Sequence, residues 1–287
     1  MDREIHLRRS VLYAPGVNRR ALNKARGLPI DCLIMDLEDA VAPDAKSEAR
    51  ESVVETLAAG GFGGRETAVR INGLDTPWGA EDIAAMACAG ADAIVIPKVE
   101  SAAAVEAVVE ALACAGAPAE LPLWIMAETP RGVLDLDAIC RSQPRIGVVV
   151  MGTSDLAKSM RLPHTPGREG LMTALGHCLL VARAHGLDIL DGVFLDLQDS
   201  TGFHQACQQG RAWGCDGKTL IHPNQIAVAN EIFGVSATAL AQAQKIVVAW
   251  ERVESEGGGL AVVDGRLVER LHVDEAERLL ALAEAIG

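Results

Sequence analysis

Residues 146–151 read IGVVVM, a continuous run of apolar, mostly β-branched residues that ends at Gly152. A strand with one face in water alternates apolar and polar residues, whereas a strand covered on both faces is apolar throughout. This run therefore predicts a buried strand of a parallel sheet. Shorter runs of the same kind occur at residues 33–35 (LIM) and 93–96 (AIVI), so the pattern repeats along the chain.

In total, the chain contains eight apolar or β-branched runs, separated by longer stretches with helical spacing. The predicted strands are Ser10–Tyr13, Cys32–Asp36, Ala68–Ile71, Ala93–Ile96, Leu123–Ala127, Ile146–Met151, Asp188–Leu190 and Lys218–Ile221. Each interval has room for the crossover helix that a parallel βαβ unit requires. Eight units predict an α/β protein with a (β/α)8 TIM barrel. An open doubly wound sheet is the alternative, but its dinucleotide-binding glycine motif is absent.

The last fifth of the chain follows a different pattern. A long helical stretch, Ala237–Glu254, is followed by three glycines at 257–259. The segment LAVVDGRLV (260–268) then places Asp264-Gly265 between two apolar runs, which is a strong hairpin signal. A final helix is predicted over Asp274–Ile286. We therefore divide the chain into a catalytic barrel, residues 1–235, and a C-terminal hairpin-plus-helix extension, residues 236–287, which we expect to pack on a neighbouring subunit.

Charge and composition exclude several classes of protein. The 26 Lys and Arg residues against 39 Asp and Glu give a net charge of −13, which disfavours binding to the phosphates of nucleic acid. No uncharged apolar run approaches the roughly 18 residues of a membrane span, and the N-terminal MDREIHLRRS lacks the apolar stretch of a signal peptide. We expect a cytoplasmic protein with no membrane or nucleic-acid partner. The seven cysteines form no CxxC motif and predict buried, reduced thiols.

Chemically reactive side chains occur at the ends of five predicted strands, where the active site of a (β/α)8 barrel lies. They are Asp36, Glu38 and Asp39 at the second strand, Arg70 at the third, Pro97 and Lys98 at the fourth, Glu128 at the fifth and Asp155 at the sixth. Each one alone has a structural alternative as a helix cap, a partner of a helix dipole or half of an ion pair, such as Asp39 with Arg70 or Arg50.

Together, these side chains indicate a metal site. Carboxylates that converge at the end of the barrel where the strands terminate, its mouth, repel one another unless a cation neutralises them. Hard oxygen ligands without a histidine or cysteine cluster favour Mg2+, with Mn2+ as the alternative. A single arginine among them suits a substrate that carries a carboxylate or an enolate. Two other signals are weaker: Gly217-Lys218-Thr219 lacks the first glycine of a phosphate loop, and His222 is expected to be structural.

Motifs in order along nearly the whole chain give these residues a family resemblance. The chain carries RRSVLYAPG, DLEDAVAPDAKSEAR, VRINGLDTPW, IPKVES, AETPRG, MGTSDLAKSM, GKTLIHPNQIAVAN and GRLVERLHV. It resembles the citrate lyase β-subunit and malyl-CoA lyase family, within the HpcH/HpaI aldolase superfamily. The resemblance is specific because the motifs occur together and at the spacing of that family.

The resemblance implies a (β/α)8 barrel that assembles as a homotrimer or hexamer and cleaves a 3-hydroxyacyl-CoA. At the matching positions, Glu128 and Asp155 hold Mg2+, and Glu38 and Asp39 support the metal through water. Arg70 polarises the substrate oxygen. The acyl-CoA substrate then lies beside a further group of residues: Tyr13, Lys24, Pro97 and Lys98.

Two positions differ from the pattern of the family. Its acid–base residue is an aspartate on the C-terminal extension, which reaches the site of an adjacent subunit, and the aligned residue here is Glu269, one methylene longer. In the first loop, Asn18 stands where several relatives carry an arginine.

These features lead to three hypotheses for the function. The leading one is a Mg2+-dependent lyase that cleaves malyl-CoA, or a related 3-hydroxyacyl-CoA, into acetyl-CoA or another acyl-CoA and a 2-oxo acid. The first alternative is a (3S)-malyl-CoA thioesterase on the same scaffold, in which the longer carboxylate activates water. The second is a citrate lyase β-like subunit that acts on a carrier-protein thioester.

Overall fold

The computed structural model describes residues 5–163 and 165–287, which form two compact units. The larger unit comprises Arg8–Ala229 and contains all the predicted site residues from Tyr13 to Asp155. The smaller unit comprises residues 5–7 and Asn230–Gly287, and therefore contains Glu269.

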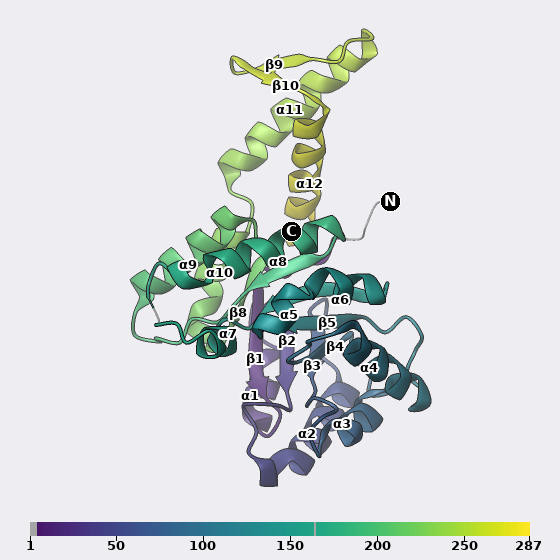
Figure 1. The fold of residues 1–287 in the computed structure, drawn as a ribbon. Helices are drawn as coiled ribbons and strands as arrows, with labels where there is room; N and C mark the ends of the chain where they lie inside the picture. The colour runs from purple at the N-terminus through teal and green to yellow at the C-terminus, as the bar shows by residue number, and fades with distance from the viewer. Residues whose placement is uncertain (1–4, 164) are drawn as a thin grey trace. The chain divides into compact units, whose positions relative to one another are not determined.

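A closed barrel of eight parallel strands forms the centre of the larger unit (Figure 1). The strands are β1 (Ser10–Pro15), β2 (Cys32–Asp36), β3 (Glu66–Arg70), β4 (Ala93–Ile96), β5 (Leu123–Ala127), β6 (Ile146–Met151), β7 (Asp188–Asp191) and β8 (Gly217–Leu220). Consecutive strands pair in order, and β8 pairs with β1 to close the ring, with Thr219 opposite Val11. The predicted barrel is confirmed, with the strand ends displaced by at most about two residues.

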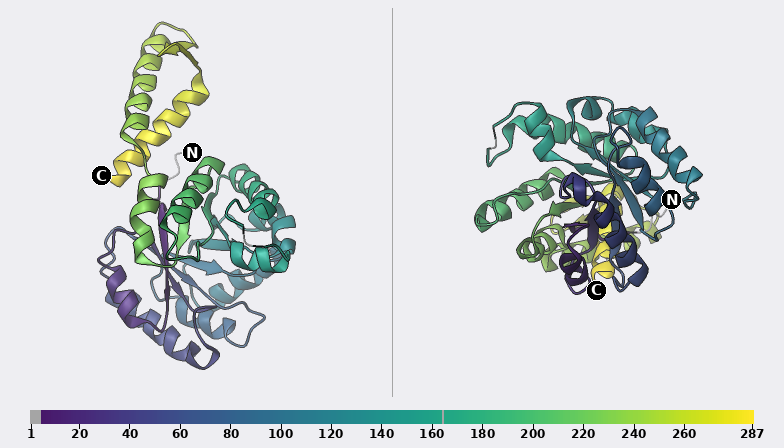
Figure 2. Two further views of the ribbon diagram at one scale, coloured as in Figure 1. Left: turned by 90° about the vertical axis from the view of Figure 1, so that its left-hand side faces the viewer. Right: turned by 90° about the horizontal axis from the view of Figure 1, so that it is seen from below.

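Helices connect the strands and surround the barrel (Figure 2). They are α1 (Arg19–Ala25), α2 (Lys46–Ala59), α3 (Gly79–Met86), α4 (Ala102–Cys114), α5 (Pro130–Leu134), α6 (Leu136–Ser142), α7 (Thr153–Ser159), α8 (Met172–Ala184) and α9 (Ser200–Trp213), with α10 (Ile226–Phe233) after β8. Short 3-10 turns, η1 (Pro43–Ala45), η2 (Glu169–Leu171) and η3 (Pro223–Gln225), precede α2, α8 and α10.

The core of the barrel explains why the strands are continuously apolar. Every residue of β2 and of β5 is buried, because one face of each strand meets the barrel interior and the other meets the helices. The interior cluster takes alternate residues of the strands, namely Val11, Cys32, Ile34, Ala68, Ala93, Val95, Trp124, Met126, Val148, Val150 and Leu190. Tyr13 packs against this cluster and is half-buried.

The cysteines are all free thiols, and five of the seven are buried as predicted. The prediction is wrong for Cys88 and Cys114, which are exposed. Cys88 follows the last turn of α3, and Cys114 is the last residue of α4. The ends of outer helices meet solvent, so a small thiol there has no core to enter.

The smaller unit contains a helix, a hairpin and a second helix. They are α11 (Ala237–Ser255), β9 (Ala261–Val263), β10 (Arg266–Val268) and α12 (Arg270–Ile286). Asp264 and Gly265 have φ angles of +49° and +76°, as a two-residue type I′ hairpin turn requires. Trp250 of α11 packs on the hairpin and on Val273. The last helix begins four residues before the predicted Asp274, because Glu269 is its N-cap.

One helical stretch has the length and composition of a membrane span. It covers Pro223–Ser255 and has a mean hydropathy of 1.4 in its most apolar window. In the structure this stretch is divided, because α10 ends at Phe233 and α11 begins at Ala237, with Ser236 as N-cap.

Candidate functional site

The last residues of β2 and β3 form a buried ion pair at the mouth of the barrel. Asp36 lies opposite Arg70 in the strand register. Arg70 donates from Nε and Nη2 to the two carboxylate oxygens of Asp36 at 2.7 and 2.6 Å. Two parallel hydrogen bonds fix the plane of a guanidinium as well as its position. Asp36 therefore holds Arg70 rigidly and leaves its Nη1 atom for other contacts.

The free edge of Arg70 lies against three predicted site residues, Glu38, Asp39 and Tyr13. Its Nη1 lies 3.0 Å from Glu38 Oε2 and 3.8 Å from Met126 Sδ. The guanidinium also lies 5.0 Å from the centroid of the Tyr13 ring. The distance to Glu38 allows an ion pair, but the angles leave Glu38 Oε2 buried without a hydrogen bond.

Lys98 joins the two sides of the mouth. Its backbone N–H donates to Glu128 Oε1 at 2.7 Å, and its ammonium pairs with Glu38 and lies 3.4 Å from Asp39. Its φ angle is +48°, a left-handed conformation that costs free energy for a residue other than glycine and that often occurs at functional sites. Pro97, the residue before Lys98, lines a cavity at the mouth together with Lys98, Glu38 and Asp39.

Glu128 is a deeply buried carboxylate of the mouth. It follows β5 and is 1% exposed. Burial raises the pKa of Glu128 to about 7, because a carboxylate away from water is costly. Gly152, after the neighbouring strand β6, makes room for it: a Cβ at residue 152 would lie 2.3 Å from Glu128 Cβ and 2.4 Å from Oε2.

Asp155 lies in the first turn of α7, after the strand that pairs with β5. It is half-buried and forms no hydrogen bond or ion pair within the part of the chain that the structure describes. Its carboxylate is thus uncommitted. Glu128 and Asp155 follow adjacent strands, as predicted for a pair of metal ligands.

Positive side chains already offset part of the negative charge at this mouth. The sequence predicts that converging carboxylates require a cation, and Arg70 and Lys98 together contact Asp36, Glu38 and Asp39. The suggested pairing of Asp39 with Arg50 is wrong, because Arg50 pairs with Glu81 and Asp82. The carboxylates without a positive side chain against them are Glu128 and Asp155.

Two predicted residues are not part of this cluster. Lys24 is exposed on α1, and its ammonium has no polar partner among the described residues. Glu269 belongs to the smaller unit, where it is exposed and its N–H donates to His272 Nδ1 at 3.0 Å. The weaker signals prove structural: Lys218 is buried against Asp191 at 2.7 Å, and His222 Nδ1 accepts from Asn224 N at 3.2 Å.

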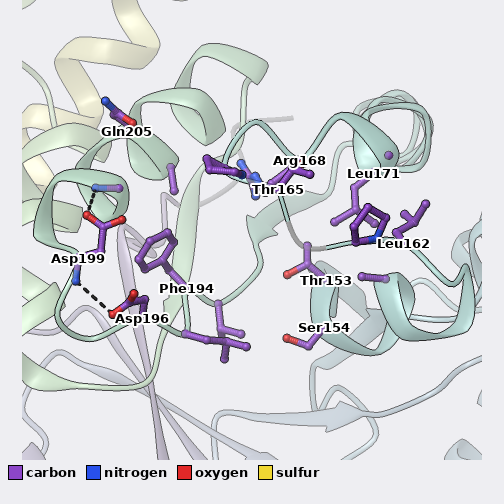
Figure 3. Close-up of a pocket in the computed structure, with 18 residues that line it drawn as sticks. Thr153, Ser154, Leu162, Thr165, Arg168, Leu171, Phe194, Asp196, Asp199 and Gln205 are labelled. Carbon is purple, nitrogen blue, oxygen red and sulfur yellow. Dashed lines mark hydrogen bonds between the residues drawn. The ribbon is translucent and has the colours of Figure 1, made fainter.

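Two cavities adjoin the mouth. One of about 630 Å³ is bordered by Glu38, Asp39 and Lys98, and extends to Trp78. The other, of about 400 Å³, lies between α7 and the loop after β7, with Thr153 and Ser154 on one side and Phe194 and Asp196 on the other (Figure 3).

Sequence reasoning missed the side chains that hold the mouth in shape. Asp36 was expected among the carboxylates of a metal site, but it is the partner of Arg70. Lys46 and Asn72 stand inside the motifs DAK and VRING, and both are buried and hydrogen-bonded to the loop after β2. The sequence did contain this lysine and this asparagine inside two specific motifs, but their spacing along the chain does not show that they contact the same loop.

A comparison of the sequence with protein families identifies the family to which this chain belongs. The profile of the HpcH/HpaI aldolase/citrate lyase family matches residues 9–223, from the start of β1 to just beyond β8. The chain belongs to this family. The match covers every strand of the barrel and hence all the mouth residues described above.

Individual members of the HpcH/HpaI family match almost the whole chain. A (3S)-malyl-CoA thioesterase of Cereibacter sphaeroides is 48% identical over 287 residues, which cover 100% of this chain and 98% of the relative. An L-malyl-CoA/beta-methylmalyl-CoA lyase of Rhodobacter capsulatus is 34% identical, and the match covers 97% of this chain and 95% of the relative.

A solved structure agrees with the fold. Protein CitE of Mycobacterium tuberculosis, in complex with magnesium, acetoacetate and coenzyme A, has a TM-score of 0.76 and 28% identity, covering 96% of this chain and 97% of that one. The comparisons confirm the predicted family. Of the two activities predicted for a free CoA ester, they support the thioesterase alternative more strongly than the leading lyase hypothesis.

The carboxylate oxygens at the mouth of the barrel suit a hard divalent cation. Among the described residues, no three His, Cys, Asp or Glu side chains come together as metal ligands. Mg2+, however, commonly binds through one or two carboxylates, while water and substrate oxygens complete its octahedron. Glu128 and Asp155, at the ends of adjacent strands, provide such a pair of carboxylates. The residues therefore fit the predicted group.

Proposed function

We propose that this protein hydrolyses (3S)-malyl-CoA to malate and coenzyme A. The observation that carries the proposal is 48% identity to a (3S)-malyl-CoA thioesterase over 100% of this chain and 98% of that relative. The mouth is consistent with it, because a fixed arginine and buried carboxylates suit an acyl group that bears a hydroxyl and a carboxylate.

We propose Mg2+ as the metal, held by Glu128 and Asp155, with Mn2+ as a substitute. Bound Mg2+ supplies a Lewis acid that orients the hydroxy-carboxylate end of the malyl group. The Lys98 N–H keeps Glu128 pointed at the site through its bond to Oε1. Water around the carboxylates is limited, since Glu128 and Glu38 are both buried.

The protein side chains then carry the hydrolysis. Arg70, fixed by Asp36, stabilises the negative charge that develops on the thioester carbonyl oxygen. Glu38 takes a proton from the attacking water and returns it to the leaving sulfur, in place of Glu269, to which the family resemblance gives the acid–base role. Asp39 keeps the supporting role that the resemblance implies. Tyr13, Lys24, Pro97 and Lys98 contact the acyl-CoA.

The assembly and location complete the proposal. We propose a cytoplasmic homo-oligomer, a trimer or a hexamer, in which the C-terminal extension packs on a neighbouring subunit. The exposed apolar side chains of the hairpin and of α12, such as Val262, Leu267 and Leu271, are consistent with a contact there.

A product assay tests the proposed reaction. Purified protein with (3S)-malyl-CoA and Mg2+ is expected to release free CoA and malate in equal amounts, with no glyoxylate. Removing the metal with EDTA should abolish the release, and added Mg2+ should restore it, because Lewis-acid stabilisation is worth several kcal/mol. Equal amounts of glyoxylate and acetyl-CoA would instead establish the lyase, for which the 34% identical relative is the precedent.

Gly152 provides a test of the geometry around Glu128. In Gly152→Ala, the new Cβ would overlap Glu128 and push its carboxylate away. A displacement of about 1 Å costs about 100-fold in rate, so we expect kcat for CoA release to fall by about that factor. Gly147→Ala in β6, the strand that precedes Gly152, is the control, because a Cβ there meets nothing within 4 Å. Equal activity of the two variants would contradict the role given to Glu128.

A further inference from the structure

A buried lysine without a role in the proposed reaction lies against the loop after β2. Lys46 is the first residue of α2, and its side chain is buried. Its ammonium donates to Leu37 O at 2.7 Å, to Glu38 O at 2.7 Å and to Asn72 Oδ1 at 2.8 Å. A lysine ammonium has three N–H donors, so all of them are engaged.

The three acceptors of Lys46 are neutral oxygens. Burying an ammonium costs free energy, and burial lowers the pKa of Lys46. Three hydrogen bonds and the Trp78 ring, whose centroid lies 5.0 Å from the ammonium, offset that cost. The ammonium provides simultaneous hydrogen bonds to two consecutive carbonyls, those of Leu37 and Glu38.

Asn72 reinforces the same loop from the end of β3. Its Nδ2 donates to Leu37 O at 2.8 Å and to Asp82 Oδ2 at 2.6 Å. Asp82 also accepts from the Asn72 N–H at 2.9 Å and from Arg50 Nε at 3.0 Å. The oxygen that Lys46 contacts on Asn72 is thus fixed in orientation, because the amide nitrogen is committed elsewhere.

The loop is held from its other side by Asp36. Its carboxylate accepts from the N–H groups of Glu38 and Ala40 at 2.9 and 3.0 Å. Glu38 therefore has its N–H bound to Asp36 and its C=O bound to Lys46. A backbone fixed at both polar groups fixes the direction of the Glu38 Cα–Cβ bond, and in the rotamer observed Oε2 lies 3.0 Å from Arg70 Nη1.

We infer that Lys46 is a positioning residue, whose ammonium holds the Leu37–Glu38 backbone so that the Glu38 carboxylate stays against Arg70. The inference rests on the proposed function, because Glu38 is the residue that accepts the proton of the attacking water there. Lys46 borders the cavity beside the mouth, but its three donors are all engaged within the protein, and it acts through Glu38.

Lys46→Met tests the inference by keeping the length of the side chain and removing its donors. We expect kcat for CoA release from (3S)-malyl-CoA to fall by about 100-fold, the cost of a misplaced catalytic group. KM should change by less than about threefold, since all three donors of Lys46 are engaged within the protein and none is left for the substrate. Lys245→Met, in the smaller unit, is the control and should keep the activity of the wild type.

A double mutant separates positioning from general damage to the fold. If Lys46 acts through Glu38, Lys46→Met should change kcat by less than about twofold in a Glu38→Gln background, because coupled residues are not additive. Independent, multiplied losses would overturn the inference, as would a Lys46→Met variant with full kcat. If Lys46→Met does not fold, as judged by its melting curve, Lys46→Gln takes its place, since the shorter amide keeps donors but cannot reach both carbonyls.

A measurement without substrate distinguishes this inference from the proposed function. Hydrogen exchange of the amides at residues 37–40 should become about tenfold faster in Lys46→Met, because local opening is easier once the carbonyls are released. Unchanged exchange would overturn the inference even if the wild type hydrolyses malyl-CoA. Conversely, faster exchange with a wild type that releases no CoA would leave the positioning of the loop intact and reject the thioesterase.

Discussion

Glu128→Gln is expected to lower kcat for malyl-CoA hydrolysis by about 1000-fold, the largest effect of any single substitution. Loss of a metal worth about 4 kcal/mol of transition-state stabilisation corresponds to that factor. The amide oxygen of glutamine can still accept from Lys98 N, which is 2.7 Å from Oε1 in the wild type. Only the charge is removed, so the shape of the site is kept.

Measurements of the melting temperature and of Mg2+ binding distinguish loss of the metal from damage to the fold. Burial penalises the charged form of Glu128 and raises its pKa, so removing the charge should leave the melting temperature unchanged or higher. Titration calorimetry should show loss of Mg2+ binding. Glu120→Gln is the matched control, because Glu120 is exposed and lies before the start of the same strand, β5. A Glu128→Gln variant that retains more than about a tenth of the activity would exclude Glu128 as a metal ligand.

Arg70→Lys is expected to cost about 100- to 1000-fold in kcat although the charge is conserved. Lysine cannot make the pair of hydrogen bonds that Arg70 donates to Asp36 at 2.7 and 2.6 Å. The cation therefore loses its fixed position at the developing oxyanion, and one preorganised donor is worth about this factor. Steady-state kinetics should show the loss in kcat more than in KM.

Arg9→Lys separates the catalytic effect of Arg70 from its effect on stability. Arg9 donates a similar fork to Asp31, with Nε and Nη2 each 2.8 Å from a carboxylate oxygen, just before β1 begins. Both substitutions should reduce the free energy of unfolding in urea by about 1–3 kcal/mol. Only Arg70→Lys should lose activity. A similar loss of kcat in both variants would mean that the effect comes from general destabilisation of the barrel.

The amino-acid sequence contained enough information for the barrel and for the region of its active site. Strands such as β2 and β6 are buried on both faces, so their apolar runs are visible without any tertiary information. Parallel strands with helical crossovers leave few topologies. The same topology puts the residues after each strand at one end, which is how Glu128 and Asp155 were selected from 39 acidic residues.

The sequence was less informative about which partner each charged side chain takes. Asp36, Glu38 and Asp39 stand within four residues of one another, and spacing cannot tell which of them meets Arg70. That choice follows from strand register, which puts Asp36 opposite Arg70. The start of α12 was misjudged for a related reason, because the cap at Glu269 is a local contact with His272 and leaves no periodic signal.

The amino-acid sequence determined the helices and strands and their order, because an element that is buried on one or two faces has a regular pattern of apolar residues along the chain. The tertiary structure alone decided the geometry of the mouth: the left-handed Lys98, the space that Gly152 leaves for Glu128, and the hold of Lys46 on the loop after β2. These contacts join residues from different strands and loops of the barrel. Their energies depend on distances of a few tenths of an ångström between groups far apart in the chain, and no local pattern of residues encodes such distances.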